Sequence, residues 1–421
     1  MKSADVREID VAVVGAGIIG ICAAVNLAEA GRHVTVFDRS GVCEETSSGN
    51  AAAFAFSDVL PLAQKGMMRQ LPRWLRDPLG PLTVSPAYLP RLTPWLFRFW
   101  RAGRAQNHDR SVAAQAALMR LAEQEWMALL DRSGTRTMLR ENGALELYES
   151  EAEFRASLPG WAVRERYEIP FRHVEGAELA QLQPGLSPRF VKATFVPGWK
   201  NVSDPKQLSK AIFSHGETLT RRVQFEERLV VRVEARSEGG ARLQFAGGDI
   251  ISCKTLVIAA GAWSHRLAAQ LGERIPLETE RGYNTTLPVG AFDLKRQLIF
   301  PGHGFVVTPL ETGLRVGGAG EFAGLDAPPN YARSKAMLEK AKAFLPGLSA
   351  EGGREWLGVR PSLPDSLPVI GHARVSRGII YAFGHGHLGL TQAAATGRLV
   401  RDLAGGHVPP LDLSPFSAQR F

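Results

Sequence analysis

The start of the chain alternates between short apolar runs and one longer helical stretch. Residues 9–14 form an apolar run that ends at Gly15, and residues 34–37 form a second run that ends at Asp38. Each run predicts a buried strand. Residues 18–30, which lie between them, are rich in Ala, Leu and Ile and predict a helix. A strand, a helix and a strand in this order are typical of a parallel sheet.

The rest of the pattern predicts both helices and strands. Helices are expected at 111–130, 334–344 and 391–403, and strands within 220–260 and 295–318. Residues 137–200 show only short strand-like pieces and turns. This mixture predicts an α/β protein.

Composition narrows the class of protein further. The 421 residues carry 50 basic and 42 acidic side chains, a formal net charge of +8. Because there is no long Lys/Arg block, we expect this excess to be thinly spread and expect no nucleic-acid partner. The distant Cys22, Cys43 and Cys253 argue against a disulfide framework and favour a reducing compartment such as the cytoplasm. We find no signal-peptide segment and expect no transmembrane helix.

A glycine-rich turn joins the first predicted strand to the first helix. Gly15 permits a tight turn, Gly17 lets the backbone approach a diphosphate, and Gly20 allows close packing of the helix on the strand. The helix N-terminus then offers free N–H groups to the phosphates, and an acid after the second strand accepts hydrogen bonds from a ribose. The cofactor-binding residues expected here are Gly15, Ala16, Gly17, Ile18, Ile19, Gly20, Asp38 and Arg39. A glycine turn without a ligand is the alternative, and Arg39 is open as a phosphate partner or a solvent-facing side chain.

Three further segments bear on the choice between FAD and NAD. A small polar loop spans 45–52, a strand leads into the turn 259–264, and W-L-G-V-R-P at 356–361 precedes the glycine-rich turn 384–391. In these segments the sequence resembles the D-amino-acid oxidase superfamily of FAD-dependent oxidoreductases, and within it the bacterial D-amino-acid dehydrogenases. The resemblance covers nearly the whole chain from residue 9 onward, and it is loose over 59–200.

The resemblance implies noncovalent FAD, since no cysteine lies near the C-terminal segment to hold a flavin covalently. It implies further cofactor-binding residues at Thr46, Ser47, Ser48, Asn50, Ala51, Ala52, Val230, Ala260, Gly261, Trp263, Gly358, Arg360, Gly384, Gly386, His387, Leu388, Gly389, Leu390 and Thr391. The family usually has glycine where Ala52 stands. The glycine-rich turn and the helix behind it are suited to stabilising negative charge on a reduced flavin.

The resemblance also implies which residues act on the substrate. In the family, the arginine of the G-x-R-P segment, here Arg360, binds the substrate carboxylate, for which a guanidinium offers a bidentate fork. A structural arginine bonded to loop carbonyls is the alternative. Tyr283 is expected either to face the substrate or to lie in the core, and His303 and His387 are further active-site candidates. His385 and His387 together offer only two ligands, so no metal site is expected.

The implied reaction is the oxidation of a D-amino acid or a cyclic imino acid by hydride transfer from Cα to the flavin. Residues 367–371 and 386–391 look closest to relatives that oxidise D-proline or hydroxy-D-proline. A quinone or another respiratory acceptor is expected to take the electrons, with an oxygen-using oxidase left open. Residues 94–101 hold two Trp and two Phe among arginines. They either rest peripherally on the inner face of the cytoplasmic membrane or pack over the substrate domain.

Three other interpretations remain open: a sarcosine- or glycine-oxidase-like secondary-amine oxidase, a flavoprotein subunit of an opine-oxidase-like complex, and an NAD-dependent dehydrogenase. For the favoured interpretation we expect two discontinuous domains. A Rossmann-like FAD-binding domain joins 1–58, 201–278 and 353–421. An α+β substrate-binding domain with a mixed or antiparallel sheet joins 59–200 and 279–352.

Overall fold

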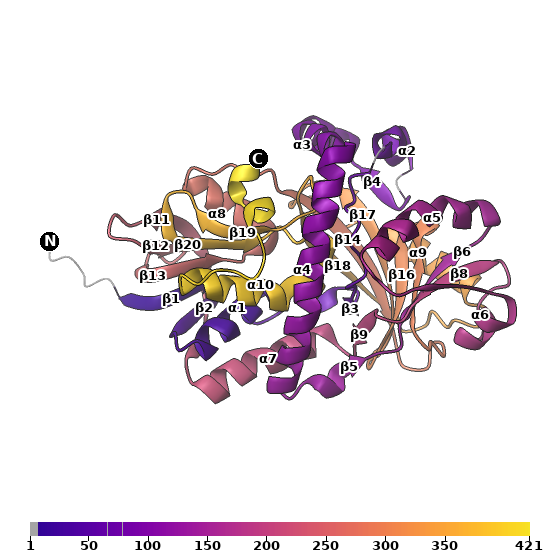
Figure 1. The fold of residues 1–421 in the computed structure, drawn as a ribbon, viewed down its shortest axis with the longest axis horizontal. Coiled ribbons are helices and arrows are strands. Elements are labelled where there is room, and N and C mark those ends of the chain that lie inside the picture. The colour runs from indigo at the N-terminus through magenta and orange to yellow at the C-terminus, as the bar shows by residue number, and fades with distance from the viewer. Residues whose placement is uncertain (1–6, 65, 78) are drawn as a thin grey trace.

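Two large β-sheets, with helices packed on them, make up most of the protein (Figure 1). The structure is a computed structural model that describes residues 7–64, 66–77 and 79–421. The long helix α4 (Ala105–Arg132) runs between the regions that contain the two sheets (Figure 1). Its buried Trp126 donates a hydrogen bond from Nε1 to the Leu390 carbonyl oxygen at 2.9 Å, which ties α4 to the start of the last long helix.

The first sheet is parallel at its centre. Its strands are β1 (Glu8–Val14), β2 (Val34–Asp38), β10 (Val223–Glu227), β11 (Val230–Ala235), β12 (Ala241–Phe245), β13 (Ile250–Ile258), β19 (Val369–Ala373) and β20 (Ser376–Phe383). The parallel strands run in the order β10–β2–β1–β13–β20. The long strand β13 pairs with β1 on one side, and on the other side first with β12 and then with β20. This is the Rossmann-like sheet that the start of the sequence predicts.

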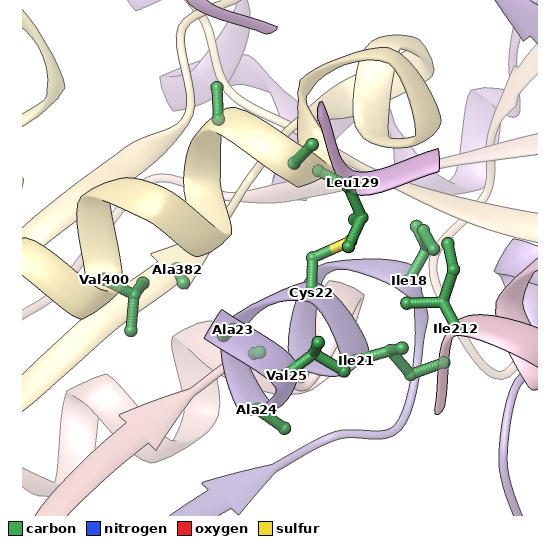
Figure 2. Packing of buried hydrophobic residues seen from close by; sticks show 14 of the residues in the cluster. Ile18, Ile21, Cys22, Ala23, Ala24, Val25, Leu129, Ile212, Ala382 and Val400 are labelled. Atoms are coloured by element: carbon green, nitrogen blue, oxygen red, sulfur yellow. The ribbon is translucent and has the colours of Figure 1, made fainter. Parts of the chain in front are cut away.

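Both faces of this sheet are covered because its strands are apolar on both sides. Val11 and Val13 face a core shared with α1 (Ile18–Glu29), α4, α7 (Pro205–Thr220) and α10 (Gly389–Ala404). Figure 2 shows the Cys22 side chain of α1 directed toward Leu129 of α4, with Ile212 of α7 on another side of α1. Ala12 and Val14 face the opposite core, with β11, β12 and α8 (Ser264–Gln270).

The second sheet is mixed, as expected from the sequence. Its order is β18 (Arg354–Ser362), β14 (Glu278–Leu287), β17 (Gly313–Phe322), β16 (Phe305–Leu310), β15 (Gln297–Phe300), β6 (Ala144–Tyr148), β8 (Lys192–Val196) and β7 (Arg172–Glu175), and β4 (Leu82–Val84) also pairs with β17. The β15–β6 and β17–β4 pairs are parallel, and the other pairs are antiparallel. Helix α9 (Ala332–Phe344) packs on one face of this sheet.

The remaining elements connect or cover the two sheets. They are α2 (Leu71–Arg76), α3 (Leu89–Ala102), α5 (Glu151–Arg166), α6 (Gly176–Leu182) and a small sheet of β3 (Ala53–Phe54), β9 (Lys200–Val202) and β5 (Leu139–Arg140). The expectation of short strand-like pieces and turns over 137–200 was wrong at α5 and α6. The start of α5 carries a capping signal, since Ser150 Oγ accepts the Glu153 N–H at 3.1 Å, but Pro159 and Gly160 interrupt the helical pattern of the sequence.

Candidate active site

A cavity of about 960 Å³ extends between the two sheets. Its lining comes from the β1–α1 turn, the loop 44–51, strands β11, β14, β17 and β18, the turn 260–263, helix α3 and the segment 382–391. Small-molecule sites occupy roughly 300–1,000 Å³. This cavity is therefore large enough for an extended ligand.

The turn between β1 and α1 needs its glycines for backbone reasons. Gly15 has a φ of +112°, and a Cβ there would lie 2.3 Å from the Ala259 carbonyl oxygen. A Cβ on Gly20 would lie 1.9 Å from the Gly15 carbonyl oxygen, so Gly20 lets α1 pack on the turn. Residues 15–19 line the cavity, whereas Gly20 does not. The N-terminus of α1, with no side-chain cap at Gly17, therefore opens onto the cavity.

Asp38 and Arg39 also line the cavity, but they differ in their partners. Asp38 accepts the Ala16 N–H at 2.7 Å and the Ser40 N–H at 2.9 Å, and burial raises the pKa of its carboxyl group. The Arg39 guanidinium donates two hydrogen bonds to Glu45, and its Cζ lies 3.9 Å from the centroid of the Trp263 ring. Arg39 is thus held by protein groups.

The loop after β2 places four of the six residues that the sequence singled out. Thr46, Ser47, Asn50 and Ala51 line the cavity. Ser48 and Ala52 do not, since Ser48 Oγ donates to the Glu45 carbonyl and Ala52 is fully buried. Ala52 has a φ of +53°, a left-handed conformation that favours glycine. This conformation explains why glycine is usual at this position in the family that the sequence resembles.

Side chains from strands of the second sheet bind this loop from the other side, through contacts that no local sequence pattern predicts. Asn284 Nδ2 donates to the Gly49 carbonyl at 2.8 Å, and Arg315 Nη1 donates to the Asn50 carbonyl at 2.5 Å. Burial lowers the pKa of Arg315 to about 10. Asn284 Oδ1 and Thr308 Oγ1 are buried at the cavity wall without a hydrogen-bond partner in the described structure. They are therefore available to a bound ligand.

The other two predicted segments reach the same cavity. Val230, Ala260, Gly261 and Trp263 all line it. So do Gly358, Gly384, Gly386, His387, Leu388, Gly389, Leu390 and Thr391. The start of α10 opens onto the cavity without an acidic residue in its first turn. Both long helices that begin at the cavity thus present N-terminal N–H groups, which favour negative charge.

The two histidines of the last turn have different surroundings. His385 is buried, its Nε2 lies 2.9 Å from Thr396 Oγ1, and burial lowers its pKa to about 3, so the ring is neutral. His387 Nε2 lies 3.3 Å from Asp58 Oδ2. Burial alone would raise the pKa of Asp58, but the hydrogen bond and charge of His387 and the charge of Arg164 outweigh it and lower the pKa. The sequence singled out His387 but not Asp58.

Arg360 reaches across its neighbouring strand and meets a carboxylate. Its Nη1 donates to Glu280 Oε1 at 2.6 Å and to the Ala319 carbonyl at 3.1 Å, and its Nη2 donates to the Gly318 carbonyl at 3.4 Å. A Cβ on Gly282 would lie 2.3 Å from Arg360 Nη2, so only glycine leaves room for the guanidinium there. Arg360 and Glu280 both line the cavity. Both the carboxylate-binding and the structural interpretation of Arg360 fit these contacts.

The other two catalytic candidates, Tyr283 and His303, bind protein groups outside the region around Arg360. The Tyr283 hydroxyl donates to Glu321 Oε2 at 2.6 Å and accepts the Asn330 N–H at 3.1 Å, and burial raises its pKa to about 12. Its side chain belongs to the core under α9, although Tyr283 is also among the residues that line the cavity. His303 does not line the cavity, and its Nε2 lies 2.6 Å from Glu149 Oε2.

Helix α3 closes one side of the cavity with aromatic side chains. Trp95 stacks on Phe99 with ring centroids 5.1 Å apart, and Trp95 also contacts Phe322 of β17. All three line the cavity, together with Leu82. The inner face of residues 94–101 therefore packs over the cavity, whereas the side chains of Phe97 and Trp100 are exposed. The two arrangements expected as alternatives, packing over the protein and exposure to a membrane, correspond to the inner packed face and the outer exposed face of the same helix.

We also searched the described part of the chain for metal sites, membrane-spanning helices and reactive cysteines. Residues 7–64, 66–77 and 79–421 contain no group of three or more His, Cys, Asp or Glu side chains placed to hold a metal ion. Within the same ranges, no helix is long and apolar enough to cross a bilayer. The three cysteines are free and buried, and none lines the cavity.

These features define a dinucleotide-binding protein with a second ligand region in the same cavity. The β1–α1 turn, the acid after β2 and two open helix N-termini suit a dinucleotide, and the unpartnered Asn284 and Thr308 oxygens suit the polar groups of a ring bound further along. A flavin adenine dinucleotide has both parts. An arginine on the same cavity gives a substrate carboxylate a place to bind.

Comparison with known proteins agrees with this class. The family model described as "FAD dependent oxidoreductase" (DAO) matches residues 10–403. The chain is 33% identical to a D-amino-acid oxidase from Bradyrhizobium diazoefficiens and 28% identical to a D-amino acid dehydrogenase from Rhizobium johnstonii, covering 98% of this chain in both cases and 98% and 99% of those proteins. The glycine oxidase structure from Geobacillus kaustophilus has the same fold, with a TM-score of 0.75, 23% identity and 99% of each chain covered.

The chain therefore belongs to the DAO family of FAD-dependent oxidoreductases. Its cofactor is FAD, and it is an FAD-dependent amino-acid oxidoreductase. The predictions of family, fold class and cofactor are thereby confirmed.

Proposed function

We propose that the protein oxidises a D-amino acid or a cyclic imino acid whose carboxylate is held by Arg360. The observation that carries this proposal is the Arg360 guanidinium, which lines the same cavity as the nucleotide-binding turn and has N–H groups not used by Glu280, Ala319 and Gly318. The names of the relatives, D-amino-acid oxidase and D-amino acid dehydrogenase, support the D configuration.

FAD, when bound, supplies the two-electron acceptor for the hydride that leaves Cα. The chain supplies orientation and electrostatics. Arg360 fixes the carboxylate and thereby the direction of the Cα–H bond. The open N-terminus of α10 favours the negative charge that arrives in the cavity with the hydride. The nitrogen must be neutral when the hydride leaves, so a substrate that binds as a zwitterion first gives one ammonium proton to solvent. Loss of the hydride then leaves an iminium ion, which water converts into an oxo acid and ammonium unless the nitrogen belongs to a ring.

A D-proline or hydroxy-D-proline substrate is our preferred choice within this class. The cavity wall formed by Trp95, Phe99, Phe322 and Leu82 is apolar and suits a compact ring. The glycine-rich strand β17 contributes Gly317, Gly318 and Gly320 to the lining, so no β17 side chain projects into the cavity at these positions.

An anaerobic titration tests the proposal. The purified flavoprotein is mixed with D- and L-amino acids, including D-proline and cis-4-hydroxy-D-proline, and its visible spectrum is followed. Bleaching of the flavin by D-substrates alone supports the proposal and ranks the substrates. Bleaching by sarcosine or glycine in their place would support a secondary-amine oxidase. A yellow protein that no substrate bleaches would support a subunit that needs a partner, as in an opine-oxidase-like complex.

We further propose that a respiratory quinone takes the electrons, with the protein resting on the cytoplasmic face of the membrane through residues 59–108.

The expectation that the positive charge is thinly spread was wrong. Residues 59–108 contain eight basic residues and one acidic residue, so nearly all of the chain's net charge of +8 lies there. Bilayers with anionic lipids attract such a segment by about 1 kcal/mol for each basic side chain near the surface.

Helix α3 adds apolar groups to this charge. Phe97 and Trp100 are 56% and 45% exposed, and their ring centroids lie 5.7 Å apart. The Arg104 guanidinium lies 4.3 Å from the Trp100 ring centroid, and Arg98 and Arg101 are exposed beside them. Aromatic rings flanked by arginines are suited to the boundary between headgroups and acyl chains.

A sedimentation assay with lipid vesicles tests the membrane proposal. We expect the protein to bind phosphatidylcholine vesicles only when they contain phosphatidylglycerol, and to be released by salt because the attraction is screened. Replacing both Phe97 and Trp100 by Glu should abolish binding. The same change at the exposed Val289 and Val408, which lie outside residues 59–108, should leave it intact. Equal binding of both double variants would contradict the proposal.

A further inference from the structure

The Glu280 carboxylate stands next to Arg360 inside the cavity, and the sequence gives no sign of it. Glu280 Oε1 accepts from Arg360 Nη1 at 2.6 Å, and Oε2 accepts from Ser362 Oγ at 3.1 Å. Glu280 is only 8% exposed and lines the cavity. A carboxylate this buried needs a compensating charge, which Arg360 provides.

These contacts leave hydrogen-bonding capacity on both members of the pair. A carboxylate has more lone pairs than the two contacts of Glu280 use, and a guanidinium has more N–H donors than the three contacts of Arg360 use. The pair therefore offers a negatively charged acceptor and a positively charged donor side by side. Glycines at 282 and 320 let the pair lie directly against the strand backbones, since a Cβ on Gly282 would lie 2.3 Å from Arg360 Nη2 and a Cβ on Gly320 would lie 3.0 Å from Glu280 Oε1.

We propose that Glu280 binds the ammonium group of the substrate while Arg360 binds its carboxylate, so that the site selects the zwitterion of an amino acid. The inference rests on the proposed function, in which Arg360 holds the carboxylate. The pair has no net charge, and neither has a zwitterion, so their complex stays neutral. A 2-hydroxy acid would bring an uncompensated negative charge close to Glu280, where the weakly polar surroundings make repulsion costly. Glu280 thus discriminates between amino acids and acids that lack the amine.

Two ligands of the same shape test this discrimination. 2-Aminoisobutyrate and 2-hydroxyisobutyrate differ only in carrying an ammonium or a hydroxyl group, and neither has a Cα–H bond to oxidise. Each is titrated into the FAD-loaded enzyme, and dissociation constants are read from the change in the flavin spectrum. The measured quantity is the ratio of the two dissociation constants, which cancels any general loss of affinity.

The informative variant is Glu280→Gln, with Glu278→Gln as its matched control. Glu278 lies two residues away on β14 and bonds the Tyr88 hydroxyl at 2.9 Å, but it does not line the cavity. We expect wild-type enzyme and E278Q to prefer the amino ligand. In E280Q the amino ligand should bind more weakly and the hydroxy ligand more tightly. The ratio should change by roughly tenfold to a hundredfold, the range of hydrogen bonds to charged groups.

Opposite shifts of the two ligands support the inference, because a merely structural Glu280 would weaken both. Equal shifts, or an unchanged ratio, overturn it. If E280Q does not retain flavin, the ratio of the two dissociation constants is measured in the wild-type enzyme and in Glu280→Asp. A wild-type ratio near one overturns the inference. A preference for the amino ligand in both proteins supports it. If no amino acid bleaches the flavin of the wild-type enzyme and neither ligand changes its spectrum, the proposed function is wrong, and the inference that rests on it is wrong too.

Discussion

The β1–α1 turn and the Arg360–Glu280 pair line the same cavity, but they are built from different material. The turn is made of backbone, and its glycines leave no room for a Cβ. The pair is made of two side chains from neighbouring strands, and its geometry depends on each side chain having the other as a partner. We therefore expect changes in the turn to affect cofactor retention and stability together. Changes in the pair should affect substrate binding while the cofactor stays.

The largest effect is expected for Gly20→Ala. Its Cβ would lie 1.9 Å from the Gly15 carbonyl oxygen, so α1 must move away from the turn. We expect a loss of about 3 kcal/mol in the free energy of unfolding and loss of bound flavin, measured by urea denaturation and by the visible spectrum. Gly247→Ala, where a Cβ would meet nothing within 4 Å, is the control. A G20A protein that is yellow and as stable as the control would show that the turn has room for a Cβ, and it would contradict the contrast between the turn and the pair.

The second effect is expected for Arg360→Lys. Lysine keeps the charge next to Glu280 but loses the forked geometry that a carboxylate needs. We expect flavin content to stay normal and kcat/KM for the best substrate to fall by roughly tenfold to a hundredfold. Steady-state kinetics at saturating acceptor measures this. Loss of flavin at unchanged kcat/KM per bound flavin would show that the pair serves the cofactor and not the substrate.

A smaller effect, dependent on pH, is expected for His385→Gln. Burial holds the pKa of His385 at about 3 in the folded protein, whereas its ordinary value is 6.5. Between these values the unfolded chain takes up a proton and the folded protein does not. The free energy of unfolding therefore falls as the pH falls, by up to about 1.4 kcal/mol per pH unit.

Denaturation in urea at pH 7 and pH 5 measures this dependence. The H385Q variant should lose less stability between the two pH values than wild type. His407→Gln, at an exposed position, should behave like wild type. Identical losses in H385Q and wild type would contradict the argument.

The smallest effect is expected for Ala52→Gly, which changes backbone freedom alone. Ala52 has a φ of +53° and is fully buried, so glycine removes strain without exposing a new surface. We expect a gain of a few tenths to about 1 kcal/mol in stability, visible as a small rise in Tm. Ala51→Gly, where φ is not positive, should lower stability instead. A loss at both positions would show that the backbone at Ala52 is not strained.

Much of the fold could be predicted because local patterns carry it. The apolar runs at β1 and β2 and the glycines between them fix a strand–helix–strand unit without reference to distant residues. Helix α5 was missed although Ser150 and Glu153 give a capping signal, because Pro159 and Gly160 resemble a loop when read in isolation. Local sequence patterns thus identified the first unit and missed the interrupted helix.

In the candidate site, too, residues of a local motif could be predicted, and partners that are distant in the sequence could not. The turn residues could be identified from a local motif, whereas Glu280 lies 80 residues from Arg360 and Asp58 lies 329 residues from His387. No local pattern links such partners, since only the pairing of β14 with β18, or the fold as a whole, brings them together. Tyr283 illustrates the converse. Its position on β14 was noted, but the bulge beside it and the hydroxyl's bond to Glu321 could not be derived from spacing.

The pairing of β1, β13 and β20 has a consequence for how the protein is made. The strand that begins the chain becomes part of a complete sheet only when residues 376–383 arrive, and α10 follows still later. Because the start of α10 lines the cavity, a nascent chain that lacks residues 389–404 cannot enclose the cofactor. Until residues 376–404 have left the ribosome, β13 lacks its partner β20 and the cavity lacks the wall formed by α10, so the supply of flavin matters only from that moment on.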